Sequence, residues 1–190
     1  MNPENHCILG NMSKVQRAKY IEQIKADIPE TPDEVINIWL SDCINRFGWP
    51  PENENDWRYV LRGSKDLAYL QSLRWQLQKV KFKPAIFTPL DKGLLINLFK
   101  QNFLSQKDIH SEYAIDSLRR FESVKRYIKE KYVFPKPVVL GLSSDGYEIH
   151  DGNHRITALF YLLGYYNVQN DEIPCVNIND EQIAWVSTSI

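Results

Sequence analysis

The fold is decided by residues 137–164, which read PVVLGLSSDGYEIHDGNHRITALFYLLG. An apolar run at 137–142, rich in β-branched residues, precedes Asp145-Gly146, a pair that suits the positive φ angles of a hairpin turn. The following residues, 147–150, alternate, so that successive side chains point to opposite faces of a strand. The sequence therefore predicts two antiparallel strands joined by a tight turn.

A glycine turn and a helix follow the second strand directly. Asp151-Gly152-Asn153 interrupts the strand, and apolar residues then recur at helical spacing as far as Leu163. Gly164 is a typical helix stop. The pattern predicts strand, glycine turn and helix in succession, with His154 and Arg155 in the first helical turn.

The start of this predicted helix is a candidate anion site. A helix N-terminus has unpaired N–H groups and about half a positive elementary charge, so it attracts phosphates. Arg155 can add a bidentate fork to a phosphate, and His154 can donate a hydrogen bond or carry a proton. Spacing alone leaves a second interpretation open, in which Asp151 or Asn153 caps the helix while His154 and Arg155 lie in solvent.

The segment IHDGNHRITAL at 149–159 resembles the strand–DGxHR–helix signature of the ParB/sulfiredoxin superfamily. The wider resemblance extends from Val80 to Ile178. It implies an α+β fold with a small mixed sheet and flanking helices, in which the His-Arg turn binds nucleotide phosphates. Sulfiredoxins and a ParB-like serine kinase bind ATP there, and ParB clamps bind CTP. Sulfiredoxins place their catalytic Cys where this chain has Asn153, so we do not expect sulfinic-acid reductase activity.

The resemblance also implies roles for individual residues. The phosphate-binding residues of the turn would be Gly152, Asn153, His154 and Arg155. The secondary phosphate ligands, from the helix that precedes the hairpin, would be Arg119, Arg120 and Arg126. The catalytic candidates are Asp151, His154 and Glu148. Asp151 is the candidate Mg²⁺ ligand, although the choice of metal ligand or base between Asp151 and Glu148 stays open.

We therefore expect a nucleotide-binding protein that uses ATP or CTP with Mg²⁺ in phosphoryl transfer or NTP hydrolysis. On this hypothesis Arg155→Ala loses nucleotide affinity without a large loss of melting temperature. A second hypothesis is a DNA-binding or DNA-processing ParB-like module. A third is a catalytically inactive interaction protein that keeps only the fold.

A basic helix is the feature that the DNA hypothesis would use. Residues 117–136 contain seven basic and two acidic side chains, a local charge of +5 in a chain whose formal charge is −1. A solvated helix face is the favoured interpretation, and nucleic-acid contact is the other. The overall charge provides no global basic field for nonspecific nucleic-acid binding.

Length and composition predict one domain with an extension. The chain has 190 residues, of which 43% are hydrophobic, enough for a sizeable core. Residues 1–78 form a mainly helical N-terminal extension, whose last helix is expected over 64–77. Residues 79–190 form the ParB/sulfiredoxin-like domain, with an edge strand at 79–83 and a closing strand at 174–178. The tail from 180 to 190 matches no pattern.

Partners and compartment are predicted from charge and cysteine content. Through residue 60 the extension has six basic and ten acidic residues, which favours a protein partner over DNA. Cys7, Cys43 and Cys175 lack CxxC spacing, which argues against a disulfide framework or a structural zinc site. No N-terminal signal pattern or membrane-length apolar run occurs, so we expect a cytoplasmic protein without a membrane partner.

Overall fold

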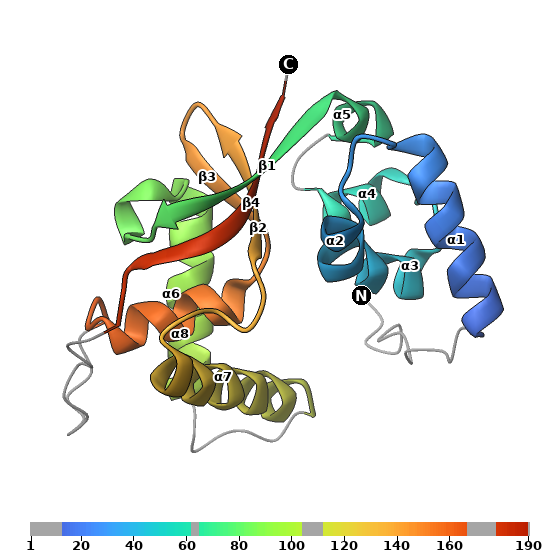
Figure 1. Cartoon of the computed structure of the whole chain (residues 1–190). Coiled ribbons are helices and arrows are strands. Elements are labelled where there is room, and N and C mark those ends of the chain that lie inside the picture. The colour runs from blue at the N-terminus through green and yellow to red at the C-terminus, as the bar shows by residue number, and fades with distance from the viewer. Residues whose placement is uncertain (1–12, 62–64, 104–111, 167–177, 190) are drawn as a thin grey trace. The chain divides into compact units, whose positions relative to one another are not determined.

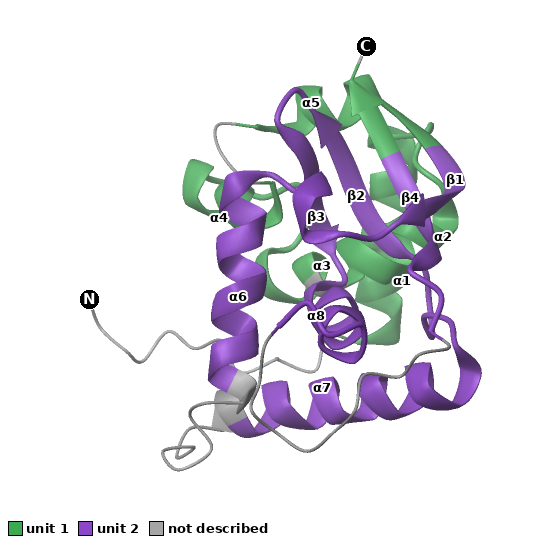
Figure 2. Ribbon diagram, turned by 90° about the vertical axis from the view of Figure 1, so that its left-hand side faces the viewer, with its two compact units in different colours: residues 1–75, 187–190 green, residues 76–186 purple. Residues whose placement is uncertain are grey.

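The computed structural model describes residues 13–61, 65–103, 112–166 and 178–189. It is an α+β fold with a small four-stranded mixed sheet and flanking helices (Figure 1). The chain divides into two compact units, residues 1–75 with 187–190 and residues 76–186 (Figure 2). The boundary falls within strands β1 (Leu73–Lys81) and β4 (Glu181–Ser189), whereas the sequence places the division between residues 78 and 79.

In its described residues, the first unit contains helices, the first residues of β1 and the end of β4. Its tryptophans pack in pairs, with 6.2 Å between the ring centroids of Trp39 and Trp75 and 5.8 Å between those of Trp49 and Trp57. Such pairs stabilise a core beyond the area they bury. The helical elements are α1 (Lys14–Asp27), α2 (Asp33–Val35), the π-helical segment η2 (Ile36–Leu40), α3 (Ser41–Phe47), α4 (Glu54–Val60) and α5 (Leu67–Ser72).

The helix predicted over 64–77 is wrong in its second half. Helix α5 ends at Ser72, and β1 begins at Leu73. Leu73 is buried but Leu77 is 50% exposed, so the leucine spacing does not mark one buried helical face. Pairing with β4 gives this segment backbone partners along the strand, which outweighs a weak local helix preference.

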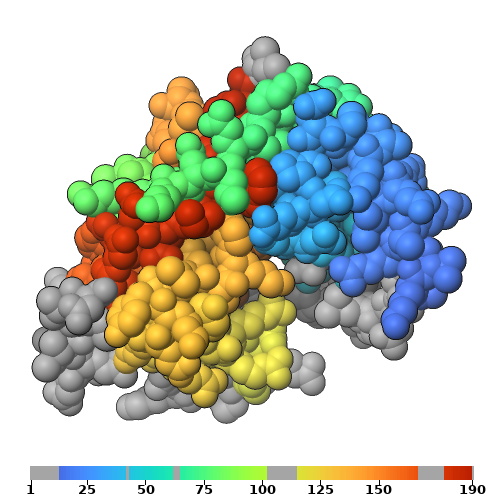
Figure 3. Space-filling view, in the orientation of Figure 1, coloured from blue at the N-terminus to red at the C-terminus, as the bar shows by residue number. Residues whose placement is uncertain are grey.

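The strand order of the sheet is β1-β4-β2-β3. Strands β2 (Val138–Ser143) and β3 (Gly146–Asp151) form the predicted antiparallel hairpin. The turn lies one residue earlier than predicted, at residues 144–145, and of the Asp145-Gly146 pair only Gly146 has a positive φ. β1 lies at one edge of the sheet. Of the edge strand predicted over 79–83, residues 79–81 belong to β1 and residues 82–83 follow its end. Most of the predicted closing strand, residues 174–177, lies outside the described residues, and the strand in the unassigned tail is β4. β4 and β1 lie side by side at the surface (Figure 3).

The helices of the second unit are η3 (Pro84–Ile86, a 3₁₀ turn), α6 (Pro89–Phe103), α7 (Glu112–Lys131) and α8 (Asn153–Leu162). α8 packs against α7 and α6. The sheet and these helices share one core, to which the fully buried rings of Phe82, Phe87, Phe121 and Phe160 contribute. Among the described helices, none is both long and apolar enough to cross a bilayer.

Candidate phosphate-binding turn at the start of helix α8

Residues Asp151 to Arg155, called here the 151–155 turn, follow a strand that is held on both edges. β2 pairs with one edge of β3. On the other edge, the Thr88 N–H donates to the Tyr147 carbonyl at 3.1 Å, and the Ile149 N–H donates to Asp91 Oδ1 at 3.2 Å. The start of α6 thus fixes β3 two residues before the turn.

Asp91 makes this attachment, and the sequence pattern did not reveal it. It is fully buried, and its Oδ2 accepts a hydrogen bond from Thr88 Oγ1 at 2.6 Å. A buried carboxylate requires such partners. Thr88-Pro89-Leu90-Asp91 has the spacing of a capping box with Pro at the first helical position, which predicts a helix start. No sequence pattern, however, connects Asp91 with Ile149.

Gly152 is required by the backbone and by packing. Its φ is 111°, in the left-handed region, and a Cβ added there would lie 2.4 Å from Val138 Cγ1. The hairpin register is irregular between Val139 and Leu140, so Asp151 lies opposite Val139 at the end of the ladder. The predicted succession of strand, glycine turn and helix is confirmed, and its geometry allows no side chain at residue 152.

Gly152 is also the residue that caps α8, and it has no side chain for this purpose. The first helical bond runs from the Ile156 N–H to the Gly152 carbonyl at 3.0 Å. The second interpretation of the sequence, with Asp151 or Asn153 in the capping position, is therefore wrong. His154 and Arg155 are not in solvent either, because both are largely buried and have partners within the protein.

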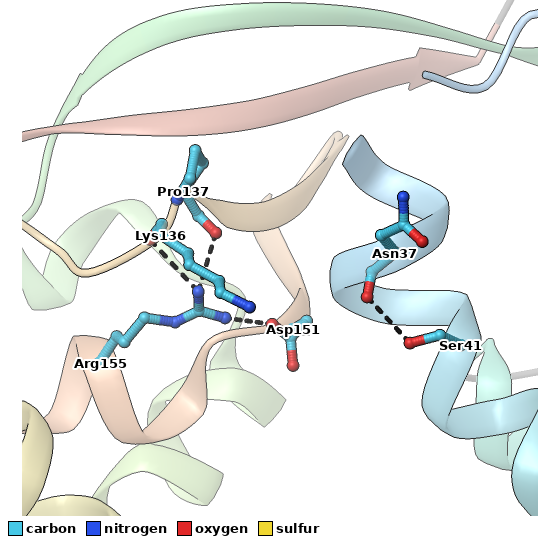
Figure 4. A network of polar contacts seen from close by, with 6 residues as sticks. All are labelled: Asn37, Ser41, Lys136, Pro137, Asp151 and Arg155. Carbon is cyan, nitrogen blue, oxygen red and sulfur yellow. Dashed lines mark hydrogen bonds and ion pairs between the residues drawn. The ribbon is translucent and has the colours of Figure 1, made fainter. Parts of the chain in front are cut away.

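Arg155 is the most constrained side chain of the turn. Its Nη1 donates to the carbonyls of Lys136, at 3.2 Å, and Pro137, at 2.9 Å, and its Nη2 pairs with the Asp151 carboxylate (Figure 4). Its side chain is 12% exposed, against 33% for Asp151. Arg155 thus ties the start of α8 to the segment that leads into β2.

Gln182, at the start of β4, holds the same segment and was also missed. Its amide accepts from the Phe134 N–H at 2.8 Å and donates to the Tyr132 carbonyl at 3.1 Å. The side chain is 3% exposed, and these bonds satisfy the buried amide. Residues 132–137, whose last two carbonyls accept from Arg155, are therefore anchored at both ends.

His154 faces α7. Its Nε2 lies 3.1 Å from Ser117 Oγ. The His154 pKa is lowered to about 4, chiefly by burial and also by the charges of Arg120 and Arg155, against the opposing effect of Asp116. His154 is therefore neutral near pH 7, in a neighbourhood where two guanidinium groups disfavour another positive charge.

The three arginines of α7 have different neighbours. Arg119 and Arg120 both pair with Asp116, at 2.7 Å, and the hydrogen bond from Arg119 is the main cause that lowers the Asp116 pKa. Arg120 is close enough to act on His154. Arg126 is nine residues from Ser117 and seven from Arg119, so at about 100° per residue it lies on the side of α7 away from Ser117, on the same face as Arg119. There it lines a shallow cavity of about 210 Å³.

Glu148 lies apart from the 151–155 turn, whereas the metal candidate, Asp151, belongs to it and pairs with Arg155. Glu148 lies opposite Gly141 in the hairpin, three residues and about 10 Å along β3 from Asp151. Among the described residues, no group of three or more His, Cys, Asp and Glu side chains could hold a metal ion. Asp151 is a single carboxylate that already pairs with a guanidinium, so the donor set does not fit a resident Mg²⁺.

Two polar atoms beside the turn are buried without a hydrogen-bond partner among the described residues. They are Asn153 Oδ1, at the first position of α8, and Thr157 Oγ1, one turn later on the same face. Thr157 is fully buried. Helical side chains lean toward the N-terminus, so the Thr157 hydroxyl lies toward the start of α8. Such atoms destabilise the free protein and mark places where a ligand or water can contribute a bond.

The charge of α7 is smaller than the window 117–136 indicates. That window begins just after Asp116, and the whole helix has six basic and four acidic residues, a net charge of +2. Besides the pairs at Asp116, Lys125 binds Glu122 at 2.9 Å and is only 13% exposed. Three of the six basic residues therefore pair with an acidic residue of the same helix.

A comparison of the chain with protein-family models, curated proteins and solved structures found no match. The resemblance of residues 149–159 to the DGxHR signature therefore stays a prediction. Cys7 and Cys175 lie outside the described residues.

Proposed function

We propose that the 151–155 turn binds the phosphates of a nucleotide, ATP or CTP, and that the protein uses the nucleotide in phosphoryl transfer or hydrolysis. The observation that carries this proposal is the start of α8, an N-terminus without a side-chain cap beside the guanidinium groups of Arg120 and Arg155. Helix N–H groups, the helix dipole and two cations all favour an anion at one place. The unpartnered hydroxyl of Thr157 can donate a hydrogen bond beside it, whereas Asn153 Oδ1 is an acceptor and adds none for a phosphate.

The proposal depends on phosphate binding by the turn and not on proton transfer by its side chains. His154, with a pKa of about 4, is a weak base, and the Asp151 carboxylate is paired with Arg155. Phosphoryl transfer depends mainly on positioning and on neutralising charge, and it requires little covalent chemistry from the protein. Mg²⁺ would enter with the nucleotide, as it does at many phosphate sites, and we assign no step to it.

The contacts of Arg155 change the experiment that tests this function. Arg155→Ala would leave two carbonyls and a carboxylate without their donor, so we now expect it to lower the melting temperature as well as the affinity. Arg120→Ala is the better variant because this side chain is 61% exposed. Arg126→Ala is its matched control, with the same charge change on the side of α7 that lies away from Ser117.

Binding of ATP, CTP and pyrophosphate is measured by calorimetry and thermal shift, with and without Mg²⁺. A ligand at a hundred times its dissociation constant stabilises the wild type by about 2.7 kcal/mol. We expect Arg120→Ala to weaken binding about fivefold or more, which corresponds to about 1 kcal/mol, and Arg126→Ala to change it less than about twofold. Absence of binding by the wild type, or equal affinities in the two variants, contradicts the proposal.

A further inference from the structure

The guanidinium of Arg155 already has an anion bound to it. Its Nη1 is fixed by the carbonyls of Lys136 and Pro137, and its Nη2 pairs with the carboxylate of Asp151, four residues earlier (Figure 4). The two carbonyls are neutral, so Asp151 supplies the negative charge in this cluster. A bound phosphate would compete for the same guanidinium.

Two carboxylates near the turn each pair with a neighbouring arginine. Asp116 accepts from Arg119 and Arg120, and Asp151 accepts from Arg155. The positive groups that favour an anion at the start of α8 are thus largely balanced by side chains of the chain itself. An incoming anion must replace a carboxylate as well as shed its own water.

Asp151 is the partner that can leave. Its side chain is 33% exposed, whereas Arg155 is 12% exposed and stays bound to two carbonyls of an anchored segment. When Asp151 turns toward water it regains hydration, so its departure costs less than moving Arg155 would. The Nη2 of Arg155 is then open on the side that Asp151 had occupied.

We propose that Asp151 is a built-in competitor of the phosphate, whose carboxylate occupies Arg155 in the free protein and is displaced when the ligand binds. This inference rests on the proposed function, because it concerns the regulation of the same turn. It also specifies the ligand class. An anion exchanges with a carboxylate on Arg155 only if it offers more negative charge or more acceptors, which favours diphosphates and triphosphates over monovalent anions.

The test measures pyrophosphate binding by calorimetry in Mg²⁺-free buffer. Asp151→Asn keeps the shape of the side chain and removes its charge. We expect it to bind pyrophosphate about tenfold more tightly than the wild type, equivalent to about 1.4 kcal/mol. The matched control is Asp145→Asn, the same change at the exposed hairpin tip, where Asn-Gly also suits the turn. We expect its affinity to stay within about twofold of the wild type.

Asp151→Asn binding no tighter than the wild type overturns the inference and leaves the proposed function intact, provided that the wild type binds. If neither protein binds pyrophosphate, the proposed function fails and the inference fails with it. The wild type alone supplies a second measurement, should the variant not fold. On titration with pyrophosphate, the NMR signals of the Asp151 carboxyl carbon and the Arg155 guanidinium nitrogens should move together. If the Arg155 signals move while the Asp151 signal stays fixed, the inference is also overturned.

Discussion

The imidazole Nε2 of His154 lies 3.1 Å from the hydroxyl oxygen of Ser117, which joins the first turn of α8 to the first half of α7. The neighbours of this imidazole are Asp116 and Arg120 on α7 and Arg155 on its own helix. The proton state of His154 therefore depends on both helices.

His154 should make the stability of the protein depend on pH. Its pKa is lowered from 6.5 to about 4 in the folded protein. As the pH falls below 6.5, the unfolded chain takes up a proton that the folded protein does not. Stability is therefore complete above that pH and is lost as the pH falls toward 4, by an amount on the order of 3 kcal/mol. Urea unfolding of the wild type and His154→Gln at about pH 7 and about pH 4.5 measures this loss. The variant should show a flatter dependence, and equal slopes would refute the assignment.

Thr157→Val should stabilise the free protein. The Thr157 hydroxyl is buried without a partner, and Val has nearly the same shape without the polar atom. We expect a gain of about 1 kcal/mol in the free energy of unfolding. Thr88→Val is the matched control, because that buried hydroxyl donates to Asp91 and should cost about 2 kcal/mol when it is removed. A loss of stability in Thr157→Val would show that the hydroxyl has a partner.

Asp91 should control the local stability of β3. Asp91→Ala removes the acceptor of the Ile149 N–H, and we expect a loss of about 3 kcal/mol. Asp91→Asn keeps an acceptor oxygen at the same place and should cost about 1 kcal/mol. Hydrogen exchange of the Ile149 amide reports the difference directly. Persistent protection of this amide in Asp91→Ala would contradict the role given to Asp91.

Gly152→Ala and Gly93→Ala should have opposite effects. At Gly152 the φ of 111° and the approach of Val138 both oppose a Cβ, and we expect a loss of about 2 kcal/mol or more. Gly93 lies in helix α6 with open space around its Cβ position, so Ala should stabilise it by about 0.5 to 1 kcal/mol. Chemical denaturation of the two variants measures both changes, and effects of the same sign would contradict the roles given to these two glycines.

The hairpin and the turn could be predicted because their signals are local. Gly146 and Gly152 have positive φ angles that favour glycine, and the alternation between them sets the faces of β3. The partners of Arg155 are a different case. Its pairing with Asp151 follows from a spacing of four residues, but the carbonyls of Lys136 and Pro137 reach it only through the tertiary fold.

β4 could not be predicted because its burial does not follow hydrophobicity. Gln182 and Ser187 are buried, whereas Ile183 is 40% exposed. The Gln182 amide is satisfied by backbone groups 48 and 50 residues away, which no sequence pattern records. Leu77 shows the opposite mismatch, a hydrophobic residue that is exposed. Its spacing from the preceding leucines led to the prediction of a helix where the chain forms β1.

The place of β4 in the sheet also sets the order in which the sheet can form. The β2–β3 hairpin needs only contacts between residues a few positions apart, whereas β1 pairs with β4, which follows it by about 100 residues. Pairings that close such long loops form slowly. The hairpin and its turn can therefore assemble early. β1 can join the sheet only after β4, which lies between β1 and β2, has been added.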